Sequence, residues 1–128
     1  MLFHIIYGVA VNSGQTLPLL DIALLQGYVD RLGKNIVEQM FALYQQQAKV
    51  YLADIKHAQV ADDSQLWQEH CHKMKGASAS VGLLQLHKQL VALEKSTVSQ
   101  AEKAECFLVL ENENQRAINE FQNWLNQV

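Results

Sequence analysis

Apolar residues recur every three or four positions along most of this chain, and they do not alternate with polar residues as they would in a half-buried strand. The clearest run places Trp67, Cys71, Met74, Ser78 and Val81 at successive spacings of four, three, four and three residues. This spacing brings all five side chains to one face of a helix. Since no proline follows Pro18, nothing breaks the helices beyond it. The pattern predicts an all-α fold.

Capping and turn residues divide the pattern into five helices. Asp21 suits the N-cap of a short helix that runs through Leu32 and stops at Gly33. The cluster 62–64 predicts a loop followed by an N-cap, and Gly82 marks the turn between the third and fourth helices. The last helix is expected from about Ser99 to about Gln127. The buried edges expected for the second, fourth and last helices are Val37, Phe41, Tyr44, Ala48, Tyr51 and Ile55; Leu83, Leu86, Leu90 and Leu93; and Phe107, Leu110, Ala117, Phe121 and Trp124.

Four longer helices joined by short loops predict an antiparallel four-helix bundle, with the short N-terminal helix as an additional cap. The segment before this helix is different. Met1–Val11 is mostly apolar, but no Lys or Arg occurs before Arg31, so the basic start of a signal peptide is missing, and the stretch is too short to span a bilayer. We expect residues 1–18 to be a tail or linker remnant that docks on the domain, and residues 19–128 to form one bundle domain.

Charge and cysteine content exclude several functional classes. The net charge is −3 and the ten cationic residues are scattered, so there is no electrostatic case for nucleic-acid binding. Cys71 and Cys106 are too few and too far apart for a disulfide framework or a thiolate zinc site, which favours a reducing cytosol. The six glycines form no phosphate-binding loop, so we expect the chain not to bind ATP.

The candidate chemistry lies on the third helix, at His72. The 4-3-4-3 stripe places this residue at the rim of the buried face. Lys75 and Gly76 lie one helical turn from His72 and Ala79 lies two turns away, so no bulky side chain covers the imidazole on that side. The pattern predicts an accessible, nucleophilic histidine.

This stretch resembles the histidine-containing phosphotransfer (HPt) domains of bacterial phosphorelays. Their motif is a small apolar residue, His, any residue, an apolar residue, Lys, Gly, five mostly small residues and a second Gly. The matching positions are Cys71, His72, Lys73, Met74, Lys75, Gly76 and Gly82. The resemblance extends over roughly residues 19 to 127 and includes 20–33, which look like the first helix of such domains in hybrid sensor kinases. Cys71 replaces the usual alanine, which changes size more than chemistry.

The resemblance implies that His72 accepts a phosphoryl group from an aspartyl phosphate on one receiver domain and passes it to an aspartate on another. The receiver would supply Mg²⁺ and most of the catalysis, so we expect a carrier without a cofactor of its own and without enzymatic activity. The expected partners are receiver domains of response regulators or of a hybrid kinase, with no nucleic acid and no direct membrane insertion. We expect a cytoplasmic monomer, either the C-terminal module of a membrane-anchored sensor kinase or a free-standing relay protein.

Glu94 is the candidate partner for the imidazole. His72 lies ten residues before Gly82 and Glu94 twelve after it, about 15 and 18 Å along antiparallel helices, so the two come roughly level. A carboxylate there would hold the proton on one ring nitrogen and fix the tautomer. Related domains often have Gln or Glu at this offset, although a solvated helix charge is the other interpretation.

Lys75, as the family's matching lysine, would reach a phosphoryl oxygen or an acidic pocket on the partner; otherwise it is a solubilising surface charge. A glycine inside a helix costs about 0.8–1 kcal/mol relative to alanine, so Gly76 requires either a closely packed helix or room for a partner's backbone. Because Gly76 and Ala79 share the face of His72, we favour access for a docking receiver. The simplest interpretation of Gly82 is that it ends the third helix.

Two other functions remain possible for such a bundle. Glu69 and His72 have the Glu-x-x-His spacing of di-iron bundles, weakly echoed by Asp54 and His57, but the last two helices offer no convincing buried carboxylates, so we expect no metal. His70 and His72 lie about 200° apart on a helix and cannot share an ion. The second possibility is an interaction bundle without chemistry, against which the motif from His72 to Gly82 argues. The other histidines, His4, His57, His70 and His87, are expected to be ordinary surface or boundary residues.

Overall fold

The computed structural model describes residues 17–128, and within them the chain forms five α-helices. They are α2 (Ile22–Leu32), α3 (Lys34–Val60), α4 (Ser64–Ser80), α5 (Leu84–Glu94) and α6 (Gln100–Gln127). The expected tail over 1–18 falls almost wholly on residues 1–16, which lie outside the described part of the chain. No helix between residues 17 and 128 is both long and apolar enough to cross a membrane.

The helix boundaries follow the local capping signals. The side chain of Asp21 accepts a hydrogen bond from the backbone N–H of Leu24 at 3.1 Å, and α2 begins one residue after this cap. Asp63 caps α4 and Ser99 caps α6 in the same way. Gly33 separates α2 from α3 with a φ of 89°, which a residue with a side chain rarely adopts. The predicted helices are therefore confirmed.

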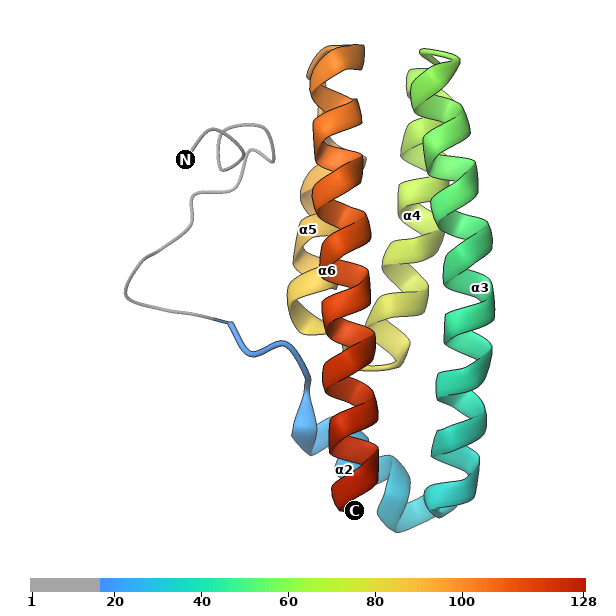
Figure 1. Cartoon of the computed structure of the whole chain (residues 1–128), viewed down its shortest axis with the longest axis vertical. Helices are drawn as coiled ribbons and strands as arrows, with labels where there is room; N and C mark the ends of the chain where they lie inside the picture. Colours follow the sequence, from blue (N-terminus) through green and yellow to red (C-terminus); the bar gives the residue numbers. More distant parts are fainter. Residues whose placement is uncertain (1–16) are drawn as a thin grey trace.

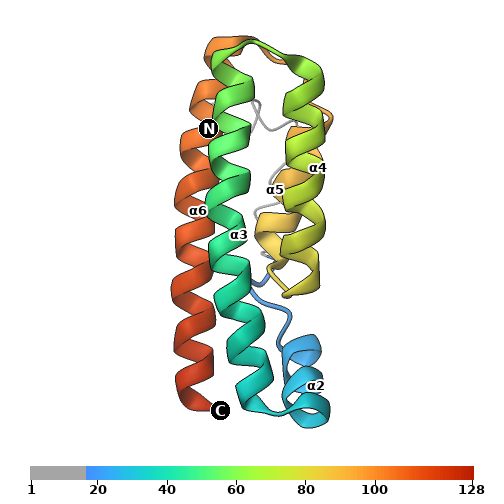
Figure 2. The same ribbon diagram turned by 90° about the vertical axis from the view of Figure 1, so that its right-hand side faces the viewer.

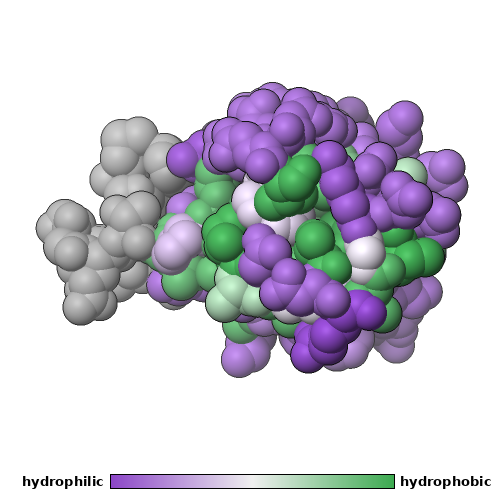
Figure 3. Space-filling model, turned by 90° about the horizontal axis from the view of Figure 1, so that it is seen from below, coloured by the Kyte–Doolittle hydropathy of each residue, from purple (hydrophilic) through white to green (hydrophobic). Residues whose placement is uncertain are grey.

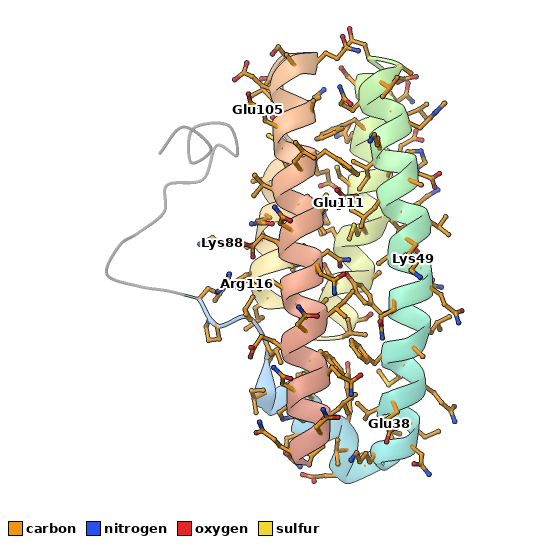
Figure 4. All side chains as sticks on the ribbon, in the orientation of Figure 1. Glu38, Lys49, Lys88, Glu105, Glu111 and Arg116 are labelled. Atoms are coloured by element: carbon orange, nitrogen blue, oxygen red, sulfur yellow. The ribbon has the colours of Figure 1, made fainter. Side chains whose placement is uncertain are left out.

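Helices α3 and α6 are the long members of an antiparallel bundle, and α4 and α5 form a shorter hairpin beside their upper parts (Figure 1). Seen from the side, α2 lies below this hairpin and against the lower part of α3 (Figure 2). The four-helix bundle and the short capping helix predicted from the sequence are both confirmed. The lower end, formed by α2 and the nearby ends of α3 and α6, shows hydrophobic surface among polar side chains (Figure 3). Charged side chains of both signs, such as Glu38 and Lys49 on α3 and Glu111 on α6, lie along the long helices (Figure 4).

The core contains nearly all the positions that the spacing predicted. All five residues of the α4 stripe are buried, as are the four leucines of the α5 edge. Tyr51 and Trp124 are only partly buried and pack against the rim of the core. Leu125 takes the inner position that we expected for Trp124, because Leu125 lies four residues after Phe121 and so continues the buried face of the helix. The Trp124 ring instead contacts the Phe121 ring edge-on.

The hairpin of α4 and α5 is fixed at both ends. At its turn, Gly82 has a φ of 70° and its carbonyl accepts a hydrogen bond from the backbone N–H of Asp21 at 2.8 Å. A Cβ on Gly82 would lie 3.4 Å from Asp21 Cβ and from Leu25 Cγ, so glycine also permits the close contact with α2. At the open end, the indole N–H of Trp67 donates to the carbonyl of Leu93 at 2.8 Å. These contacts set the register in which α4 faces α5.

Candidate functional site

His72 lies on the outer face of α4, where its side chain is 67% exposed. Its position follows from its neighbours, because Cys71 and Met74 are fully buried and turn the intervening surface of the helix outward. The backbone beneath the ring is thus held by the core while the ring itself meets solvent. A solution partner can reach it without any rearrangement of the bundle.

Glu94, the last residue of α5, reaches across to the imidazole. Its Oε1 lies 2.5 Å from Nδ1 of His72, and its Oε2 accepts a hydrogen bond from Nζ of Lys75 at 3.0 Å. The Glu94 side chain is 11% exposed and that of Lys75 is 22% exposed, so this pair is far less solvated than His72. The hairpin brings together the three residues that the sequence had singled out, and it places Lys75 on Glu94, a contact that we had not expected.

The electrostatics of Glu94 identify the free nitrogen of the ring. Burial by itself would raise the pKa of the Glu94 carboxyl, but hydrogen bonds from Lys75 and His72, with the charges of both, lower it below its ordinary value. The carboxylate is therefore ionised at neutral pH and can only accept hydrogen bonds. Nδ1 of His72 must then carry the proton, which leaves the lone pair of the neutral ring on Nε2.

The surface beside His72 is low and open. Gly76 and Ala79 are exposed, and a Cβ added to Gly76 would find no atom within 4 Å outside its own helix. Of the two explanations for a glycine here, close packing of a neighbouring helix is therefore wrong. The helix surface on this side of the ring is therefore open.

A shallow hollow of about 440 Å³ adjoins the ring on its other side. It is lined by Gln65, Gln68, Glu69, His72, Lys73 and Glu94, which come from α4 and α5 alone. The lining is polar and mixes both signs of charge. It leaves space for a group bonded to the ring.

The described residues around His72 do not match the di-iron pattern. Glu69 and His72 both point to solvent, whereas the di-iron pattern needs such pairs inside the bundle. Within residues 17–128, no three His, Cys, Asp or Glu side chains lie close enough together to hold an ion.

The remaining described histidines have different surroundings. His57 is exposed, and Nδ1 of His70 lies 4.0 Å from Oδ2 of Asp54 on the α3 side of α4. His87 is partly buried, with its Nδ1 3.2 Å from the carbonyl of Lys75. His4 lies outside the described residues.

Comparison with known proteins agrees with this geometry. A family profile described as Hpt domain matches residues 39–127. The aerobic respiration control sensor protein ArcB of Escherichia coli (strain K12) is 31% identical over 77 residues, which cover 60% of this chain and 10% of ArcB. The ArcB of Shigella flexneri gives the same values, so the chain spans about a tenth of the length of these curated relatives.

A solved structure shows the same fold. The histidine-containing phosphotransfer domain of ArcB from Escherichia coli superposes with a TM-score of 0.76 at 22% sequence identity. The match covers 85% of this chain and 94% of that domain.

Proposed function

This chain belongs to the Hpt domain family, and we propose that it carries phosphoryl groups in a two-component phosphorelay, with Nε2 of His72 as the acceptor. The observation that carries this assignment is the contact between Nδ1 of His72 and Oε1 of Glu94 at 2.5 Å. It fixes the tautomer that leaves a lone pair on Nε2 of a ring that is mostly exposed. Acceptance then needs no proton transfer before the attack.

The donor in this proposal is an aspartyl phosphate on a receiver domain. Nε2 attacks phosphorus, the bond between phosphorus and the aspartyl oxygen breaks, and its electron pair leaves with the aspartate carboxylate. The reverse step delivers the phosphoryl group to a second receiver. Phosphoryl transfer requires mainly positioning and charge stabilisation, so an exposed ring on a rigid helix is sufficient on the carrier's side.

The surrounding residues support docking of a receiver. Gly76 and Ala79 leave room for its backbone beside the ring. Lys75 bonds to the same carboxylate as the ring, so in this proposal its ammonium group exchanges Glu94 for a phosphoryl oxygen. Mg²⁺ and most of the catalysis would come from the receiver. We therefore propose a carrier with no enzymatic activity and no cofactor of its own.

The wider setting is part of the same proposal. The relatives that contain a matching segment are sensor proteins, so this chain would serve a comparable sensor kinase or act as a free-standing relay protein. We propose a cytoplasmic, monomeric domain whose partners are receiver domains and not nucleic acids. The scattered charges of a chain with net charge −3 agree with the last point.

Transfer of radiolabelled phosphate tests the proposal directly. Candidate receivers carrying labelled aspartyl phosphate should label the wild-type protein, and His72→Gln should abolish the label while leaving the melting temperature within error. His57→Gln is the matched control, because it removes an exposed histidine that lies on α3 and not on α4. The His57→Gln protein should be labelled normally. Labelled His72→Gln protein would show that the acceptor lies elsewhere.

A further inference from the structure

The residue that holds the imidazole is an ionised carboxylate, although a neutral amide could orient the ring equally well. A glutamine oxygen would accept the same hydrogen bond from Nδ1 and select the same tautomer. A carboxylate differs in its second acceptor oxygen, which here bonds to Lys75, and in its full negative charge, which lies 2.5 Å from the ring on a side chain that is 11% exposed. Tautomer selection alone gives no reason for that charge.

We propose, building on the proposed function, that Glu94 retains the Nδ1 proton of His72 after phosphorylation and thereby keeps the phosphorylated ring in the form that readily donates. Glu94 is in this view a positioning residue for a proton as well as for the ring. The carboxylate would set how easily the carrier gives its phosphoryl group away.

The electron balance of transfer explains why this proton matters. When Nε2 forms its bond to phosphorus with Nδ1 still protonated, the ring becomes a cationic phosphoimidazolium. Cleavage of the nitrogen–phosphorus bond returns the electron pair to Nε2 and regenerates neutral imidazole. If the Nδ1 proton had been lost, the same cleavage would have to expel an imidazolate anion, a far poorer leaving group.

Among the charged groups around the ring, Glu94 has the largest effect on the Nδ1 proton of His72. On α4, Glu69, Lys73 and Lys75 are the charged neighbours, whereas α5 contributes Glu94 and α3 contributes no residue to the hollow. Lys75 bonds to the far oxygen of Glu94 and moderates its charge, while Glu69 and Lys73 oppose one another. An opposite charge within about 4–6 Å favours the charged form of an ionisable group, so the Glu94 carboxylate should favour the protonated form of the phosphorylated ring.

The test follows the ring proton directly. Protein labelled with ¹⁵N-histidine is phosphorylated with potassium phosphoramidate, and the Nδ1 chemical shift of His72 is recorded against pH by NMR. In Glu94→Gln the phosphorylated ring should lose its proton at a lower pH than in wild type. Its phosphoryl group should also hydrolyse more slowly near pH 7.5, in proportion to the smaller protonated fraction.

Two further variants distinguish charge from packing. Glu69→Gln removes a nearby charge without a hydrogen bond to the ring, and it should shift the midpoint far less than Glu94→Gln. Glu94→Asp retains the charge on a shorter side chain, and it should keep the midpoint nearer to wild type than the amide does. A circular dichroism melt on each variant shows that the bundle is folded.

The outcomes separate this inference from the proposed function. Equal midpoints for wild type and Glu94→Gln, with His72 phosphorylated in both, would overturn the inference and leave the carrier function intact. If neither phosphoramidate nor any phosphorylated receiver modifies His72 in the wild-type protein, the proposed function fails, and the inference fails with it.

Discussion

Replacing Gly76 with glutamine should make the protein more stable and a poorer carrier. The residue lies in the middle of α4, one turn from His72, and a Cβ there would meet nothing within 4 Å. The substitution therefore adds helix propensity without any clash inside the bundle. The same side chain would occupy the surface across which a receiver must approach.

The effects on stability and on docking have opposite signs, and the effect on docking is the larger. Removing a helical glycine gains about 0.5 kcal/mol or more for glutamine, and in a domain of this size that raises the melting temperature by about 2–4 °C. A side chain forced into a packed interface costs about 1–3 kcal/mol, which corresponds to a roughly 5- to 150-fold loss of receiver affinity. Gly76→Ala adds only a methyl group, so it should show the stability gain with a smaller loss of transfer.

A urea melt and a phosphotransfer time course on the same preparations measure both effects. Gly27→Gln is the matched control, because it also replaces a helical glycine, in α2, and its Cβ would meet only the flexible end of the Arg31 side chain at 3.2 Å. It should transfer normally. Loss of stability in Gly76→Gln, together with normal transfer per folded molecule, would refute the docking account of this face.

Two further changes test interactions that the structure places inside the bundle and at the site. Lys75→Met should lower the free energy of unfolding by about 1 kcal/mol at pH 7, because it removes the bond to Glu94. The folded-state pKa of Glu94 lies below its ordinary value of 4.5. The stability that the Lys75–Glu94 bond contributes is therefore present above about pH 4.5 and disappears as the pH falls through the lowered value. Urea melts that show the same difference between wild type and Lys75→Met in acid as at pH 7 would contradict this prediction. Tyr44→Phe should lower the free energy of unfolding by about 1–3 kcal/mol, because Oδ1 of Asn114 loses its buried donor at 2.6 Å. Asn114→Leu added to Tyr44→Phe should recover much of that loss in thermal melts, and an additive further loss would show that the hydrogen bond is not the cause.

The helices and their apolar faces could be predicted because both depend on nearby residues. Asp21 and Ser99 act on backbone groups within three residues, and the stripe through Trp67 repeats within a single helix. The proximity of Glu94 to His72 was also predictable, since the chain turns at Gly82 and the helical rise per residue sets the distance of each residue from that turn.

Buried polar residues were not predictable, since their partners come from distant parts of the chain. Lys103 is 6% exposed, with its Nζ 5.3 Å from the centre of the Trp67 ring, and its sequence neighbours show no sign of this. Asn114 lies in the core because Tyr44, seventy residues earlier, donates to it. Such pairings depend on the register between helices, which local spacing does not determine.

The position of Glu94 at the end of α5 explains why Lys75 belongs to the site. A negative charge at a helix C-terminus is opposed by the helix dipole, so an isolated Glu94 would be held in an unfavourable place. Lys75 and the Nδ1–H of His72 supply the compensating donors. The last residue of a helix also tends to fray, but the bond from Trp67 to the carbonyl of Leu93 anchors the backbone one residue earlier. The buried indole therefore holds the carboxylate in place, and the carboxylate fixes the imidazole tautomer, so that Nε2 of the exposed ring has the lone pair that the proposed transfer requires.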